Sequence, residues 1–111
     1  MPVITTLIQN LGLTRQQADV YLAALELGES TVQELARKSG VKRTSIYNFI
    51  DELKKRQLLF ETTRKKRSVF GAATPQQLLE LSKVRLKELE SSLPQLMAIN
   101  NRSLKKPRVT F

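Results

Sequence analysis

The sequence predicts a mainly α-helical fold with one small β-hairpin, followed by a long C-terminal helix. Apolar residues recur with helical spacing over most of the chain, and capping signals mark where helices begin. The pattern changes to that of β-strands only between residues 58 and 73. With 111 residues, of which 41% are hydrophobic, the chain is long enough for a compact domain with a modest core.

Four helices are expected before the hairpin. They lie between Pro2 and Gly12, between Thr14 and Gly28, between Thr31 and Gly40, and from Lys42 to about Arg56. Two of them begin with a capping box, because a threonine is followed three residues later by Gln17 or Glu34. The residues expected on the apolar faces are Val3, Ile4, Leu7, Ile8, Leu11, Ala18, Tyr21, Leu22, Leu25, Val32, Leu35, Ala36, Ile46, Phe49, Ile50 and Leu53.

The hairpin is expected from two β-prone segments, residues 58–63 and 68–73, which are separated by the basic run of residues 64–67. Thr74 and Pro75 then predict the start of a long helix, because proline suits the first helical position. Pro94 is expected to bend or divide this helix, since it lacks a backbone N–H and clashes with the preceding turn.

Residues 30–53 have the pattern of a helix-turn-helix. This motif needs a small residue in its first helix, a glycine in the turn and an aliphatic residue in its second helix. Ala36, Gly40 and Ile46 have these roles. Since a hairpin follows, the sequence predicts a winged helix-turn-helix followed by a long C-terminal coiled-coil helix. An ordinary helical hairpin is the alternative, because the spacing of Ala36 and Gly40 is common by itself.

The basic charge is concentrated. The formal net charge is +9, and residues 31–67 hold eleven basic residues against four acidic ones. Such a surplus attracts polyanions, and nucleic acid is the common polyanionic partner of a small basic domain. The local concentration favours a binding face over a surface that merely happens to be basic.

The candidate DNA-binding residues lie at the start of the second helix of the motif, at the cap of the first helix, and in the wing. They are Thr31, Lys42, Arg43, Thr44, Ser45, Tyr47, Asn48, Arg64, Lys65, Lys66 and Arg67. Arg43 is suited to guanine and Asn48 to adenine in the major groove, while the wing cations suit phosphates or a minor groove. The alternatives are a solvated helix surface, a Tyr47 ring packed on the hairpin, and wing charges that block edge-to-edge strand pairing.

Leucines of the C-terminal helix recur at alternating spacings of three and four residues, as in a coiled-coil seam. The expected dimerisation residues are Leu79, Leu86, Leu89, Leu93 and Leu96, with Ser82 and Asn100 in the same register. The alternative is that this stripe packs on the core of its own domain.

The sequence contains no cysteine and no histidine. Their absence excludes disulfides, thiolate or imidazole metal sites, and a nucleophile–histidine pair. We therefore expect that the protein is not an enzyme, and that it has no catalytic residue, no metal site and no cofactor. There is also no signal peptide or membrane span, which predicts a cytoplasmic protein, nucleoid-associated in a prokaryote.

Residues 11–59 closely resemble the N-terminal domain of the TrmB family of sugar-responsive transcription regulators. The resemblance rests on a Leu-Gly-Leu opening, on a helix core made by Ala18, Tyr21 and Leu22, and on a tyrosine-containing recognition helix. It extends over about residues 7–99 and implies operator binding as a homodimer, with Arg43, Thr44, Ser45, Tyr47 and the wing near the DNA. Members of the family continue into a large effector domain, so no sugar response is assigned to these residues.

The expected domains are a winged helix-turn-helix at 1–73, a dimerisation helix at 74–104, and a tail at 105–111. This tail is either the start of a missing domain or the end of a short family member. The leading hypothesis is a homodimeric transcription regulator that binds double-stranded DNA sequence-specifically, with helix 42–56 in the major groove and wing 64–67 on the backbone or minor groove. No membrane partner and no small-molecule effector site are expected within these residues. The alternatives are a nucleoid-type protein that coats DNA, and a winged helix used for protein–protein assembly.

Overall fold

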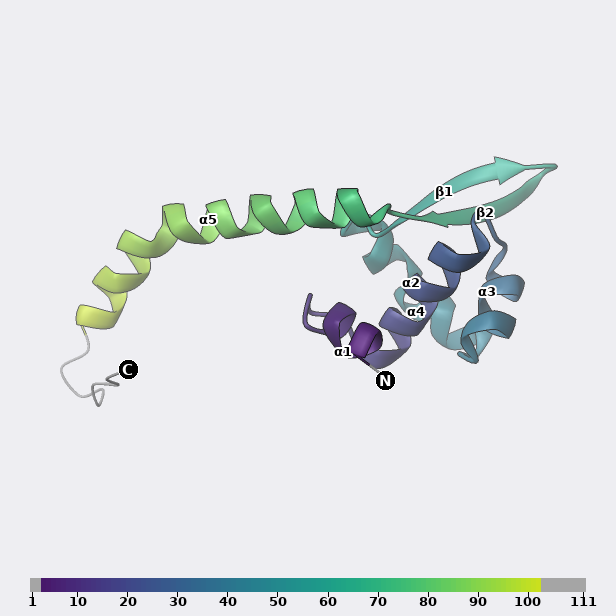
Figure 1. Ribbon diagram of the computed structural model, residues 1–111, viewed down its shortest axis with the longest axis horizontal. Coiled ribbons are helices and arrows are strands. Elements are labelled where there is room, and N and C mark those ends of the chain that lie inside the picture. The colour runs from purple at the N-terminus through teal and green to yellow at the C-terminus, as the bar shows by residue number, and fades with distance from the viewer. Residues whose placement is uncertain (1–2, 103–111) are drawn as a thin grey trace. The chain divides into compact units, whose positions relative to one another are not determined.

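The computed structural model describes residues 3–102 and divides the chain into two compact units, Met1–Pro75 and Gln76–Phe111. The elements, in chain order, are α1 (Val3–Gln9), α2 (Arg15–Leu27), α3 (Val32–Ser39), α4 (Arg43–Lys55), β1 (Leu59–Arg64), β2 (Arg67–Ala72) and α5 (Pro75–Asn101), labelled in Figure 1. This order confirms the predicted fold class. The C-terminal tail at 105–111 lies outside the described residues.

Both predicted capping boxes form. At the start of α2, the N–H of Gln17 donates to Oγ1 of Thr14 at 3.1 Å, and the N–H of Thr14 donates to Oε1 of Gln17 at 3.0 Å. A threonine cap of this kind contributes about 1 kcal/mol. Thr31 and Glu34 make the same pair of bonds at α3. The bond from the N–H of Thr31 is the main reason that the pKa of Glu34 lies below its usual value.

The core of the first unit lies where α2, α3 and α4 meet the hairpin. Its largest fully buried side chains are Tyr21, Leu35, Ile46, Leu53 and Leu59. The hydroxyl of Tyr21 donates to the carbonyl of Ala73 at 2.7 Å, so the one polar atom of this ring is satisfied inside the core. Burial raises the pKa of Tyr21. The bond ties α2 to the end of the hairpin and therefore helps to fix the wing.

Two parts of the expected apolar faces are not in the core. On α1, Ile8 is buried, but Ile4 and Leu7 are both 56% exposed, because this short helix packs against α2 with one side only. Leu25 of α2 is 39% exposed. The buried face of α2 includes Val20 and Ala24, whereas Leu25, which was expected on the apolar face, lies at its exposed edge.

The hairpin is antiparallel, and its ends are paired from Leu59 with Ala72 to Arg64 with Arg67. Phe70 of β2 also pairs with Ser30, which precedes α3: its N–H donates to the Ser30 carbonyl at 2.7 Å, and the Ser30 N–H donates back at 3.0 Å. This bridge anchors one strand of the wing to the helix-turn-helix. No local pattern in the sequence predicts it, because Ser30 and Phe70 are far apart along the chain.

The end of α4 has a Schellman motif with glutamine at the position that favours glycine. Gln57 has a φ of 62°. Its N–H donates to the carbonyl of Lys54 at 3.0 Å, and the N–H of Leu58 donates to the carbonyl of Leu53 at 2.9 Å. A side chain in this left-handed conformation costs stability that glycine does not.

We therefore expect Gln57→Gly to raise the free energy of unfolding by about 1 kcal/mol. Urea unfolding followed by circular dichroism should show a higher midpoint with an unchanged slope. The control is Gln57→Ala, which removes the same polar side chain but keeps the backbone strain and should give no such gain. Equal midpoints for the two variants would show that the strain is not stored here.

The second unit is described by α5, which runs through Pro94 as a single helix of 27 residues. Pro94 was predicted to bend or divide this helix. It does not divide α5, and Figure 1 shows α5 curving along its C-terminal half. None of its residues is buried. The exposed fractions of its seam leucines range from 47% for Leu96 to 57% for Leu86 and Leu89. No described helix is long and apolar enough to cross a membrane.

Candidate nucleic-acid interface

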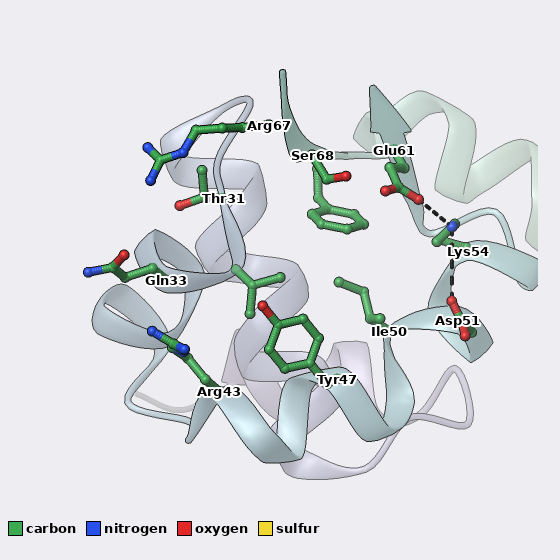
Figure 2. A pocket seen from close by; sticks show the side chains of 12 residues that line it. Thr31, Gln33, Arg43, Tyr47, Ile50, Asp51, Lys54, Glu61, Arg67 and Ser68 are labelled. Atoms are coloured by element: carbon green, nitrogen blue, oxygen red, sulfur yellow. Dashed lines mark hydrogen bonds and ion pairs between the residues drawn. The ribbon is translucent and has the colours of Figure 1, made fainter. Parts of the chain in front are cut away.

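A groove of about 530 Å³ lies between the start of α3, one side of α4 and the hairpin. Figure 2 shows it from close by. Its lining residues are Thr31, Val32, Gln33, Arg43, Tyr47, Ile50, Asp51, Lys54, Glu61, Arg67, Ser68 and Phe70. The groove thus combines residues of α4 with residues of the hairpin, the two elements that the sequence predicts to contact DNA.

One end of the groove is cationic. Arg43 from α4 and Arg67 from β2 lie there beside Thr31 and Gln33 (Figure 2). Within residues 3–102, neither guanidinium forms a hydrogen bond or an ion pair, so both keep their donors for a ligand. A guanidinium donates to phosphate and to base acceptors in a forked geometry. This end is therefore suited to a polyanion.

The other end of the groove carries two carboxylates and one ammonium. Nζ of Lys54 lies 2.5 Å from Oε1 of Glu61 and 3.9 Å from Oδ1 of Asp51. Hydrogen bonds from Lys54 and then Ser68 hold the pKa of Glu61 below its usual value, and the bond to Glu61 raises the pKa of Lys54. Since one ammonium faces two carboxylates, this end carries one net negative charge near neutral pH.

The floor of the groove is apolar. Val32, Ile50 and Phe70 are buried beneath it. Tyr47 lines the groove between Arg43 and Ile50 (Figure 2) and is 57% exposed. More than half of the Tyr47 surface is therefore exposed, and the residue is not packed away against the hairpin.

The structure brings four of the candidate DNA-binding residues together in the groove: Thr31, Arg43, Tyr47 and Arg67. Others lie outside the groove on the same N-terminal part of α4, where Lys42, Thr44 and Asn48 are exposed and Ser45 is half-buried. Lys42 is the N-cap residue of α4 and makes no side-chain cap bond. The N-terminal part of α4 therefore exposes both cationic and amide side chains.

The tip of the wing differs from a simple cluster of four free cations. Arg64 is paired with Glu29, because its Nε and Nη2 donate to Oε1 and Oε2 of that carboxylate, each at 3.1 Å. Lys65 and Lys66 form the two-residue turn with φ values of 50° and 65°. Such a turn favours Asn-Gly, because both residues are left-handed. Lys65 and Lys66 therefore place two positive charges in this turn, although the left-handed conformation of both residues costs conformational free energy.

Several groove residues were missed from the sequence. Asp51 lies one turn after Tyr47 on α4, so helical spacing alone would have placed it on the same side. Glu61 and Ser68 line the groove because of the register in which β1 and β2 pair, and the sequence does not determine this register. Among the described residues, no group of three or more acidic side chains is arranged to hold a metal ion.

The three-helix motif, its anchored hairpin and the groove with one cationic end are those of a winged helix-turn-helix, an architecture typical of DNA-binding proteins. The family model described as sugar-specific transcriptional regulator TrmB matches residues 8–76. The chain therefore belongs to the TrmB family, as its sequence resemblance predicted, and this membership supports DNA binding. Curated protein sequences include no significant match to this chain.

Two solved structures have a similar fold. One is TrmBL2, an archaeal chromatin protein with a novel mode of DNA binding, which is 21% identical with a TM-score of 0.75; the match covers 89% of this chain. This chain spans 38% of the TrmBL2 chain. The other is BpsR of Bordetella bronchiseptica, whose DNA binding is regulated by 6-hydroxynicotinic acid. It is 17% identical with a TM-score of 0.56, and the match covers 96% of this chain and 72% of that chain.

Proposed function

We propose that the chain is a homodimeric transcription regulator that binds double-stranded DNA sequence-specifically. Helix α4 enters the major groove, and the wing at residues 64–67 contacts the backbone or the minor groove. The observation that carries this proposal is the cationic end of the groove, where the unpaired guanidinium groups of Arg43 and Arg67 come from these two elements. Specific recognition needs base contacts in addition to phosphate contacts, and α4 exposes Arg43 and Asn48 for them.

Dimerisation is assigned to α5. Its leucines repeat in a coiled-coil register and none is buried within the chain. A helix-turn-helix dimer reads two half-sites about one helical turn apart, which gives more discrimination than one domain achieves. We place the protein on chromosomal DNA and assign no catalytic activity and no small-molecule effector to these residues.

A second candidate function is a nucleoid-type protein that coats DNA with little sequence preference. It is favoured by the similarity to TrmBL2, which is a chromatin protein. The same groove and wing would serve it. The two functions differ in the ratio of affinities for a preferred site and for random DNA.

The proposal is tested at the tip of the wing. Changing Lys65→Asn together with Lys66→Gly removes two cations and relieves the strained turn. We expect the variant to unfold at higher urea concentration and yet to bind every DNA sequence more weakly. The slope of log affinity against log salt should flatten by about 0.9 for each phosphate that the wing no longer neutralises.

Fluorescence anisotropy with labelled duplexes at a series of salt concentrations measures this effect. Lys83→Gln with Lys87→Gln is the matched control, since it removes the same charge from α5. Wing and control variants with the same affinity and slope as the unmodified chain would refute a role for the wing in DNA binding.

A further inference from the structure

The groove is polarised along its length, and this asymmetry bears on how DNA is selected. Arg43 and Arg67 lie at one end, and Asp51, Lys54 and Glu61 lie at the other (Figure 2). Non-specific DNA binding depends on contacts to phosphates in any register. A groove that was cationic throughout would accept the backbone in many registers, whereas this groove attracts phosphate at one end only.

We propose that the carboxylates of Asp51 and Glu61 repel DNA phosphates from their end of the groove, and that they thereby penalise non-specific complexes more than the specific one. This inference rests on the proposed DNA binding. It assigns the two acids a role in specificity that acts by repulsion, which is one of the two ways in which a protein discriminates between ligands.

The ion pairs do not remove this repulsion. One ammonium faces two carboxylates, and Lys54 is already committed to Glu61 at 2.5 Å. Asp51 is only loosely paired, at 3.9 Å, and its side chain is 83% exposed. The carboxylate of Asp51 is therefore open to any phosphate that approaches along α4.

A purely structural role is the competing explanation, because Lys54 and Glu61 join α4 to β1. Asp51 separates the two explanations, since it is exposed and contributes little to that link. Asp51→Asn keeps the shape of the side chain and removes only its charge. It should leave the urea midpoint unchanged, whereas a structural role would lower it.

The experiment measures the affinities of Asp51→Asn for random-sequence DNA and for the preferred site at the same salt concentration. We expect the affinity for random DNA to increase about fivefold, because the substitution removes one repulsive contact between like charges that lie close to water. The preferred site should gain less, because its phosphates already avoid this end, so the specificity ratio should fall. The matched control is Asp19→Asn on α2, which changes the net charge equally and does not line the groove.

Equal effects of the two variants would overturn this inference alone, provided that the unmodified chain binds DNA. Weaker binding of Asp51→Asn at one base position would also overturn it, since that result would mean that Asp51 accepts a hydrogen bond from cytosine. If the unmodified chain did not bind DNA, that result would contradict both the proposed function and this inference. The gain in affinity for random DNA can be measured whether or not the protein has a preferred site.

Discussion

A variant with lysine at two seam positions of α5, Leu89→Lys with Leu93→Lys, is expected to be monomeric and to lose most of its affinity for DNA. Both leucines are at least 50% exposed within the chain, so a second copy is what would bury them. Charges placed in that seam oppose its burial. Losing the second half-site should weaken binding to a two-half-site DNA by about 10²-fold or more.

Light scattering gives the mass of this variant, and circular dichroism on the same sample shows whether the first unit remains folded. Ser91→Lys with Gln95→Lys is the matched control, because it adds positive charge at two positions outside the seam of the same helix. A seam variant that remains dimeric, or that unfolds altogether, would contradict the assignment of α5 to dimerisation.

Replacing Arg43 should have the second large effect. Arg43→Ala is expected to cost about 1–3 kcal/mol on the preferred site and to relax base choice at one position, because arginine pairs bidentately with guanine. Titration of a set of single-base variants of the site measures both effects. Arg15→Ala on α2, which does not line the groove, is the control. An equal loss of affinity for all DNA sequences would show instead that Arg43 contacts the DNA backbone.

Features that depend on neighbours along the chain could be predicted from the sequence. The two capping boxes, the turn at Gly40 and the helix start at Pro75 each rest on residues within one helical turn. The buried positions Ile46, Ile50 and Leu53 follow from helical spacing. These signals were enough to predict the order of the elements and the location of α4.

Features that depend on contacts between distant residues could not be predicted. The bridge between Ser30 and Phe70, and the pairing of Arg64 with Glu29, join residues that are 40 and 35 positions apart. The acidic end of the groove likewise needs Glu61 to meet α4 through the hairpin. The sequence therefore indicated the cationic half of the site and missed the half that opposes it.

Sequence specificity and dimerisation together form the central claim, and selection of bound fragments from random DNA at physiological salt tests both most directly. A homodimer that reads bases through α4 should enrich a palindrome whose half-sites lie about one helical turn, roughly 10 base pairs, apart. Recovery of fragments with no common motif would contradict the claim and would favour a protein that coats DNA.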